Sequence, residues 1–559
     1  MRISWLKNKK GSVLVTAFIF LVAMTTLTIM AIQRSATEYN FAKRNMLSTE
    51  AYYLAEAGAE KIAHELAKKV ANYEDEPAGD TDQWTDLCGT EIDFMSTDYD
   101  LTYTCTSLTG EYTTVSAEGI VSIERAYEVI ATVTYPEENV TATVGQVFSR
   151  KKTYTFQHAV FYATDLELLP GSDMTLTGKI HANNDVYIDA DSGATLTIDT
   201  DFLRTAGKVY NMRKDSGAGL AGDVLIRVEG TSDYEKMLLD TETSPLDSRR
   251  SDWAAASQTR WGGTVQSGVH GITSLAVPEV GSIQPDGYYA TEATVKVVNG
   301  VVYKDGMPLT EGVDIPSGTV TTDTDFYNNR EEAYVRMTNI DLEKLAGWDE
   351  VMEEGVPVKK QVYSNHLPGD GLLYATRDDV GTDEQGGVRL VNGTTIDNTA
   401  GLTVVTNLPG YIQGDYNSVD KKSAAVICDA INLLSNNWDD SNSTQSLDYR
   451  TAAGTAVNAA IIAGIGVTIG NNYGGGLENY PRLHEDWGGT TLTIRGSFVS
   501  LWDSQIATGQ WKWGDPQYKA PIRDWDFDTD FFEQGNLPTY TPFAVELVRL
   551  AWWKTSGEE

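Results

Sequence analysis

Four aspartates near the C-terminus are the clearest candidates for chemistry in this sequence. They occupy every second position, so an extended strand would place their carboxylates on one face: Asp524, Asp526, Asp528 and Asp530. Carboxylates brought together in this way could act on a glycosidic bond or bind Ca²⁺. The residues between them are mostly aromatic, however, which is typical of a half-buried strand with a solvated acidic side. We favour that interpretation over either site.

A second acidic motif, Asp189-x-Asp191-x-Gly193, has the oxygen spacing that begins a Ca²⁺-binding loop. The remaining ligands of such a loop are missing, so we favour an acidic β-turn and keep Ca²⁺ as the alternative. The sequence has six histidines, none of them clustered. It contains no phosphate-binding loop, nucleophile elbow or His-Glu-x-x-His motif. We therefore expect no catalytic residues, no cofactor and no enzymatic activity.

Tryptophan is concentrated near the C-terminus, where seven of the 13 lie between Trp487 and Trp553. An exposed indole could stack on a sugar ring, which would give the chain a polysaccharide ligand. A cap over the open end of a β stack accounts for the same residues, and we favour the cap.

The composition limits the classes of function. The chain has 559 residues and a formal net charge of −36 at pH 7. Nucleic-acid binding needs a basic surface that neutralises phosphates, so we expect no nucleic-acid partner. The length exceeds what one hydrophobic core supports and predicts several structural units. Three cysteines are too few for a disulfide scaffold.

The N-terminus carries the strongest pattern. Residues 1–10 contain four basic residues and no acid, and residues 13–32 contain no charge, proline or glycine. Twenty helical residues span about 30 Å, enough to cross a bilayer. The basic flank predicts a cytoplasmic N-terminus and a single pass through the membrane. A discarded signal peptide is the less favoured alternative, because no small-residue cleavage site follows. The residues assigned to this membrane and assembly helix are Val13, Thr16, Phe18, Phe20, Leu21, Leu27 and Ile32.

The helical pattern continues beyond the membrane-length stretch. Residues 33–71 contain no proline and one glycine, and apolar residues recur every three or four positions along one stripe. The stripe comprises Leu47, Ala51, Ala55, Gly58, Ile62, Leu66 and Val70. We therefore predict one helix over residues 12–72, about 90 Å long. A simple anchor does not need the second half, whereas a helix that packs into a filament does.

These residues carry a family resemblance. Residues 9–16 resemble the class III signal of type IV pilins and pseudopilins, and residues 51–60 resemble the helix of PilX-like minor pilins. The resemblance implies that prepilin peptidase removes a leader, residues 1–11, by cutting after Gly11. Ser12 would then become the methylated N-terminus.

Thr16 departs from the pattern of major pilins, which carry glutamate at this fifth mature position. Loss of that glutamate is typical of PilX-like pilins and of the tip pseudopilin of type II secretion. The resemblance thus implies a subunit at the tip or in the initiation complex, with other minor pilins or pseudopilins as partners.

The rest of the chain reads as β structure. Alternating runs within residues 73–150 predict a small antiparallel sheet, a pilin-like head. Cys88 and Cys105 fall in this unit, where they form either a disulfide or two buried thiols. Residues 151–545 predict a large mainly-β extracellular domain with irregular insertions at about 203–400, and residues 546–559 a C-terminal tail. Short runs separated by Asn, Asp and Gly favour a β-solenoid over a β-sandwich.

Residues 156–162, 409–417 and 475–482 also resemble long PilX-like bacterial surface proteins. That resemblance bears on architecture and not on chemistry. The predicted fold class is α+β overall. The predicted function is a minor pilin or pseudopilin that presents a large β cargo, after export to the pilus or cell surface, for assembly priming or adhesion. The alternatives are a polysaccharide-acting or polysaccharide-binding β-helix protein on a membrane stem, and a simple membrane-anchored surface protein.

Overall fold

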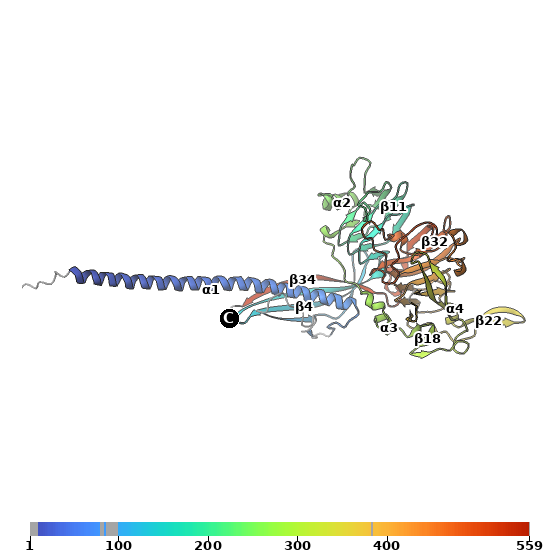
Figure 1. The fold of residues 1–559 in the computed structure, drawn as a ribbon, viewed down its shortest axis with the longest axis horizontal. Coiled ribbons are helices and arrows are strands. Elements are labelled where there is room, and N and C mark those ends of the chain that lie inside the picture. Colours follow the sequence, from blue (N-terminus) through green and yellow to red (C-terminus); the bar gives the residue numbers. More distant parts are fainter. Residues whose placement is uncertain (1–8, 79–82, 85–98, 382–383, 558–559) are drawn as a thin grey trace, which may run out of the picture.

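The molecule consists of a long helical stem and a large β-rich body (Figure 1). The computed structural model describes residues 9–78, 83–84, 99–381 and 384–557. Helix α1 (Lys9–Ala71) contains 63 residues and forms the stem. The long N-terminal helix predicted from the sequence is therefore confirmed.

Helix α1 ends in a left-handed turn. Tyr73 has φ 63°, and the Glu74 amide donates to the carbonyl of Lys69 over 3.0 Å. This bond satisfies a carbonyl that the helix leaves unpaired at its end. The Tyr73 ring stacks on Tyr288 of the body with centroids 3.8 Å apart, and its hydroxyl lies 2.8 Å from that of Tyr289. The turn thus also fastens the stem to the body.

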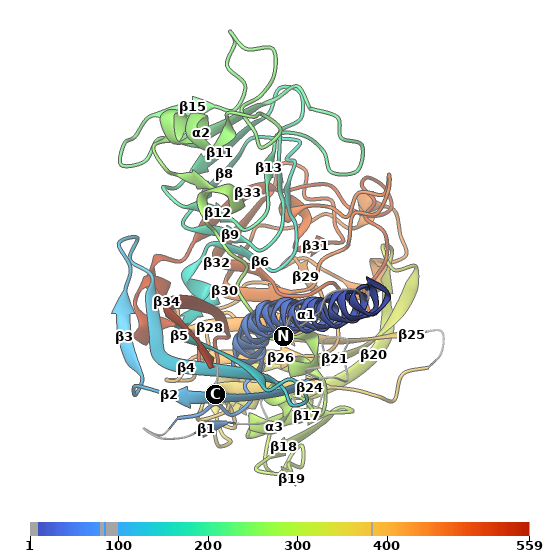
Figure 2. The same cartoon turned by 90° about the vertical axis from the view of Figure 1, so that its left-hand side faces the viewer.

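The second half of α1 packs on an antiparallel head sheet in the strand order β1-β2-β4-β5-β34, with β3 paired to β4. Figure 2 views this sheet along the helix. The strands are β1 (Gln83–Trp84), β2 (Asp100–Ser107), β3 (Tyr112–Val115), β4 (Val121–Tyr135), β5 (Val140–Tyr154) and β34 (Phe543–Gly557). Ala51, Ala55, Ile62 and Leu66 of the predicted stripe are fully buried there. At Gly58 an added Cβ would lie 3.3 Å from Leu101, so the backbone of the helix approaches the sheet closely.

The last strand changes the predicted domain organisation. Residues 546–559 were expected to form a tail, but β34 pairs antiparallel with β5, from Phe543 opposite Tyr154 to Gly557 opposite Thr141. The body is consequently an insertion between two neighbouring strands of the head sheet. Cys105 is buried in β2. Cys88 lies outside the described residues, so both alternatives, a disulfide and two buried thiols, stay predictions.

The first part of the body makes successive parallel passes. Val160 lies opposite Ile180 and Ile180 opposite Leu203, and the strands between them pair in the same way. Apolar side chains of every pass point inward and are buried. These strands are β6 (Val160–Tyr162), β7 (Leu166–Leu168), β8 (Met174–Thr177), β9 (Ile180–Ala182), β10 (Val186–Ile188), β11 (Thr195–Asp199), β12 (Leu203–Thr205), β13 (Val209–Tyr210), β14 (Asp223–Arg227) and β16 (Val265–Gln266). β15 (Tyr234–Lys236) pairs antiparallel with β14.

The second part of the body forms another parallel series, from β17 through β24, β26, β28 and β30 to β32, with β18 and β19 at its outer end. β32 then pairs in parallel with β6, so the two series meet where the chain enters the body from β5. The strands are β17 (Val295–Val298), β18 (Val301–Lys304), β19 (Met307–Pro308), β24 (Leu372–Thr376), β26 (Leu402–Thr406), β28 (Ala424–Cys428), β30 (Thr455–Ala463), β32 (Thr491–Ser500) and β33 (Ile522–Phe527).

A further sheet has the order β20-β21-β25-β27-β29-β31 and is parallel from β21 onward. Its strands are β20 (Val320–Asn328), β21 (Ala333–Asp341), β25 (Glu384–Val391), β27 (Gly410–Gln413), β29 (Ile431–Leu434) and β31 (Arg482–Leu483). The hairpin of β22 (Trp348–Glu353) and β23 (Val356–Gln361) projects from the body far from the stem (Figure 1). Short helices are α2 (Trp253–Trp261), α3 (Tyr288–Glu292) and α4 (Leu342–Leu345). The body is therefore mainly β with mostly parallel sheets.

Two residues of α1 allow a matched test of this packing. Leu66 is fully buried on the head sheet, whereas Met46 is 61% exposed. We expect Leu66→Ala to lower the free energy of unfolding by about 2–5 kcal/mol, because it leaves a cavity. Met46→Ala should change it by less than about 0.5 kcal/mol. Thermal and denaturant unfolding of the full chain in detergent checks this, and equal effects of the two substitutions would contradict it.

Candidate functional site

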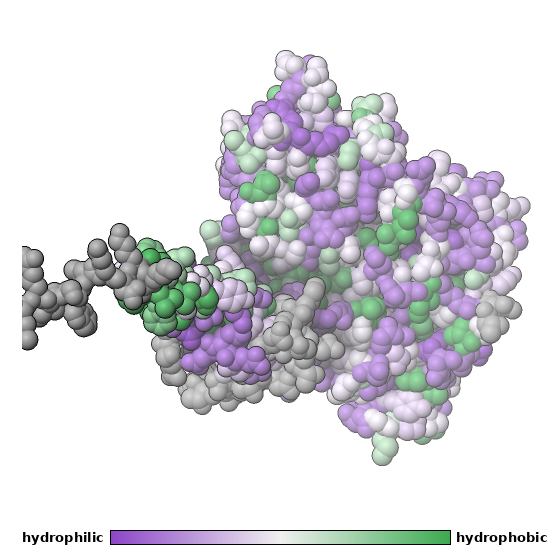
Figure 3. All heavy atoms as spheres, turned by 60° about the vertical axis from the view of Figure 1, so that its left-hand side comes forward, coloured by the Kyte–Doolittle hydropathy of each residue, from purple (hydrophilic) through white to green (hydrophobic). Residues whose placement is uncertain are grey.

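The first half of α1 is not covered by the rest of the described chain, and its first ion pair with the head is that of Lys43 with Glu138 at 2.6 Å. Every residue from 12 to 46 is exposed, and this stretch belongs to the one helix, within the described residues, that is long and apolar enough to cross a membrane. In Figure 3 apolar residues gather on the described part of this helix, whereas the visible body surface is mainly hydrophilic. All the residues assigned to the membrane and assembly helix are exposed: Val13, Thr16, Phe18, Phe20, Leu21, Leu27 and Ile32.

Leaving this surface in water would be costly. A large apolar side chain gains about 1.5–3 kcal/mol when it is removed from water. Phe18, Phe20 and Leu21 are each at least 66% exposed. The segment therefore needs a cover of lipid or protein.

The hydroxyl groups in the apolar stretch are compatible with burial in lipid or protein. The Thr16 hydroxyl donates to the Ser12 carbonyl over 2.8 Å, and the Thr28 hydroxyl donates to the Met24 carbonyl over 2.8 Å. Thr25 and Thr26 bond to the preceding turn in the same way. In hydrocarbon an unpaired polar group would be expensive. Here each of these hydroxyls is paired within the helix itself.

The predicted cleavage point lies near the start of the helix. α1 begins at Lys9, so Gly11 and Ser12 are already helical. Cleavage there depends on recognition by a peptidase and stays a prediction.

The four C-terminal aspartates do not converge on one site. β33 ends at Phe527, and the chain then turns into a short 3-10 helix, so Asp528 and Asp530 leave the strand. The expected acidic face therefore forms only within β33, where Asp524 and Asp526 are exposed. It is wrong for the two aspartates that follow the strand. The reason is local: the Asp528 carboxylate accepts a hydrogen bond from the Asp530 amide and caps that helix.

Each of these aspartates has a side-chain partner, and Asp528 and Asp530 share one. Asp524 pairs with Arg495 at 2.8 Å, and Asp526 accepts a hydrogen bond from Thr177. Lys421 lies 2.9 Å from Asp528 and 2.8 Å from Asp530. The carboxylates thus fasten β33 and its following turn to neighbouring strands.

The other acidic motif is a turn. Asp189 is buried and accepts from the amides of Leu220 and Ala190 at 2.7 and 2.9 Å. Burial raises the pKa of this carboxyl, and the amide bonds oppose that shift. Asp191 is exposed and accepts from the Ser192 amide over 2.7 Å. Within the described parts of the chain, no group of three His, Cys, Asp or Glu side chains is placed to hold a metal ion.

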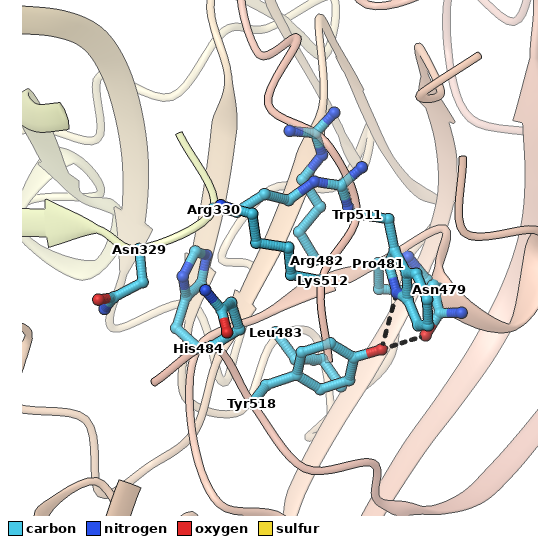
Figure 4. Close-up of a pocket in the computed structure, with 11 residues that line it drawn as sticks. Asn329, Arg330, Asn479, Pro481, Arg482, Leu483, His484, Trp511, Lys512 and Tyr518 are labelled. Atoms are coloured by element: carbon cyan, nitrogen blue, oxygen red, sulfur yellow. Dashed lines mark hydrogen bonds between the residues drawn. The ribbon is translucent and has the colours of Figure 1, made fainter. Parts of the chain in front are cut away.

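A buried charged cluster in the body was missed by sequence reasoning (Figure 4). Arg482 and Glu331 pair at 2.6 Å, with 4% and 5% of their side chains exposed. Arg330 beside them donates to the Gly509 carbonyl over 2.9 Å. Burial, with repulsion from Arg482, lowers the pKa of Arg330 to about 9. The partners lie about 150 positions apart in the chain, so no local pattern announces them.

The cavity within this cluster is small, about 10 Å³. That is room for roughly one water molecule and not for an organic ligand. Trp511 donates to the Tyr518 hydroxyl over 3.1 Å, and Tyr518 donates in turn to Asn479 (Figure 4). The cluster therefore serves as an internal strut between loops of the body.

No family model matches the chain, and no curated protein matches it. Among solved structures, the chain is similar to the competence-associated pilin ComZ from Thermus thermophilus. That match has 12% sequence identity and a TM-score of 0.22, and it covers 91% of this chain and 98% of that one. At these values the similarity bears on neither fold nor function.

The strut can be tested with two adjacent glutamates. Glu331→Gln removes a buried charge that Arg482 needs, and we expect it to lower the free energy of unfolding by about 3–5 kcal/mol. Glu332 pairs with Lys512 at 2.6 Å, but with 66% of its side chain exposed. Glu332→Gln should therefore cost less than about 1 kcal/mol. Denaturant unfolding followed by tryptophan fluorescence distinguishes them, and a small effect of both would contradict a buried strut.

Glu485 predicts a pH dependence of stability. It is buried and accepts bonds from the amide and hydroxyl of Ser435, and burial raises its pKa to about 7. In the unfolded chain the carboxyl has its usual pKa of about 4.3. The buried carboxyl of Glu485 therefore contributes fully to the stability of the fold at pH values below its unfolded pKa. This contribution is lost as the pH rises through the folded pKa of about 7.

The substitution Glu485→Gln removes this titration. Between pH 4.5 and 7.5, the stability of the parent relative to Glu485→Gln should fall by up to about 3 kcal/mol. Denaturant unfolding at several pH values measures the difference. Glu354→Gln makes the same substitution at an exposed position and serves as the control. A parallel pH profile for Glu485→Gln would contradict the assignment.

Proposed function

We propose that this chain is a structural subunit of a type IV pilus or a type II secretion pseudopilus, a PilX-like minor pilin or pseudopilin. One observation carries the proposal. A single unbroken helix leaves residues 12–46 exposed and apolar for much of their length, while its second half is buried on a small antiparallel sheet. This division fits a helix held first by lipid and later by neighbouring helices.

Residues 13–32 would hold the chain in the inner membrane, with the basic N-terminus in the cytoplasm. Residues 33–42 continue for about 15 Å more before Lys43 meets the head. Assembly would move the apolar surface from lipid into the core of a fibre. The paired hydroxyls of the threonines allow both environments.

The body supports a position at the tip or in the initiation complex. It is inserted at the end of the head that lies away from the free half of α1. A unit of this size would obstruct repeated stacking of subunits in a thin fibre. Thr16 supports the same position, because its hydroxyl is bonded within its own helix and no carboxylate there calls for a charge from a neighbouring subunit.

The parallel passes of the body support a β-solenoid as its architecture, because strands of successive passes stack in register. Such a surface would serve adhesion or assembly priming at the cell surface. Other minor pilins or pseudopilins would be its assembly partners, and prepilin peptidase would process it before assembly.

The N-terminus of the protein tests this proposal. We expect mass spectrometry of the chain from its host's membranes to find a methylated Ser12 as the first residue. In a strain without prepilin peptidase the first residue should be Met1. Gly11→Leu should also block cleavage, because the peptidase recognises the residue that directly precedes the cut. Leu14→Ile should leave cleavage unchanged.

Other starting residues would overturn the proposal in distinct ways. A start at Met1 in both strains would leave a simple membrane-anchored surface protein. A start beyond about residue 33 would mean that the apolar segment is a discarded signal peptide.

A further inference from the structure

The outer edge of β34 is open along most of its length. β34 is the last strand in the order of the head sheet, and its inner edge pairs with β5 over its whole length. On its outer edge, the described residues supply one partner, Ala276, which bridges Val545 in antiparallel fashion. The edge beyond Val545 has no strand beside it in the described part of the chain.

The Ala276 bridge shows which backbone groups point outward. The Ala276 amide donates to the Val545 carbonyl over 2.9 Å, and the Val545 amide donates to the Ala276 carbonyl over 2.7 Å. Backbone direction alternates along a strand, so Leu547 and Arg549 also point outward. A bulge between Arg549 and Ala551 shifts the alternation by one residue, and the outward groups then belong to Trp552 and Lys554.

Side-chain contacts agree with this assignment, because outward-pointing residues share the face that meets α1. Arg549 pairs with Glu60 at 2.8 Å, and the Trp552 ring lies 6.2 Å from that of Tyr52. The Lys554 ammonium lies 4.5 Å from the centroid of the same tyrosine ring. Because of the bulge, the residues on both sides of it that contact α1 are also those whose backbone amides point outward from the edge.

Exposed edges are usually protected by charged side chains or proline. β34 contains no proline, and its two basic side chains, Arg549 and Lys554, are turned onto α1. Leu550 is 60% exposed and Trp552 is 39% exposed at the same edge. The edge thus offers unpaired amides beside an apolar surface, which is the combination that an added strand would cover.

We propose that the edge of β34 from Leu547 to Lys554 binds an extended strand of a neighbouring subunit, running antiparallel to β34. The added strand would continue the pairing that Ala276 begins at Val545. This inference rests on the proposed function, because the partner is a subunit anchored in the same membrane by a comparable helix. Contacts with Tyr52 hold the edge about 30 Å above residue 32, the height at which such a subunit presents its own sheet.

Lys554 gives a test of the strand edge. Its amide points away from β5, so Lys554→Pro removes an outward donor and keeps the ladder within the head. Lys554→Ala removes the same side chain and keeps the amide, which makes it the matched control. The full-length chain would be expressed in its native host with its pilus or secretion system intact. A photoreactive phenylalanine analogue at Leu550 reports proximity, with the same probe at Val313, 71% exposed on the body, as control.

We expect the probe at Leu550, but not at Val313, to form a product with a second helix-anchored subunit. Peptide mapping should place the link in a strand of that subunit. Lys554→Pro should reduce the product at least tenfold, and Lys554→Ala should reduce it less than twofold. Unfolding temperatures of the variants identify a misfolded head. If a variant misfolds, the probe at Leu550 in the otherwise unchanged chain still tests the proposal.

Other results would overturn the inference. If the chain is recovered in fibres but Leu550 gives no link to another subunit, the edge is not an interface and the proposed function stands. If the chain is absent from fibres and the edge gives no link, both proposals fail. A product of twice the mass of the chain would identify a second copy as the occupant and overturn the partner assigned here.

Discussion

Helix α1 is continuous, so the sheet that buries its second half also sets the direction of its first half. Ala51, Ala55 and Ile62 are fully buried on the head sheet, and small side chains let the helix lie close to the strands. With that half fixed, the apolar stretch extends away from the body as a straight projection (Figure 1). The same contact positions β34, since Trp552 and Arg549 reach α1 from the strand.

The body depends on this arrangement in turn. It leaves the head after β5 and returns to it at β34, and the two connecting residues, Tyr154 and Phe543, lie opposite each other in the sheet. Tyr73 adds a third attachment by stacking on Tyr288. The head can therefore form its complete sheet only when the whole insertion has brought its two ends together.

Features that depend on neighbouring residues in the sequence were predictable. The unbroken run of helix formers gave α1, and alternating runs gave the inner strands of the head, because side-chain periodicity is set by local geometry. The closing strand was not predictable, since its partner lies about 400 positions earlier and nothing local records the pairing. The Arg482–Glu331 pair was missed for the same reason. The prediction that all four aspartates share one face failed, because alternating residues share a face only within a strand. This strand ends at Phe527.

The placement of the insertion also has a mechanical meaning. Both connections to the body run along β5 and β34, whose axes follow the stem (Figure 1). Both connections lie at the same end of the pair, so a pull on the body along the stem draws β5 and β34 together. It loads the pairing of β5 with β4 in shear, where the hydrogen bonds along the two strands resist together. A pull across the strands would instead open these bonds one at a time. The head is thus strongest along the direction in which a tethered surface would draw on its anchor.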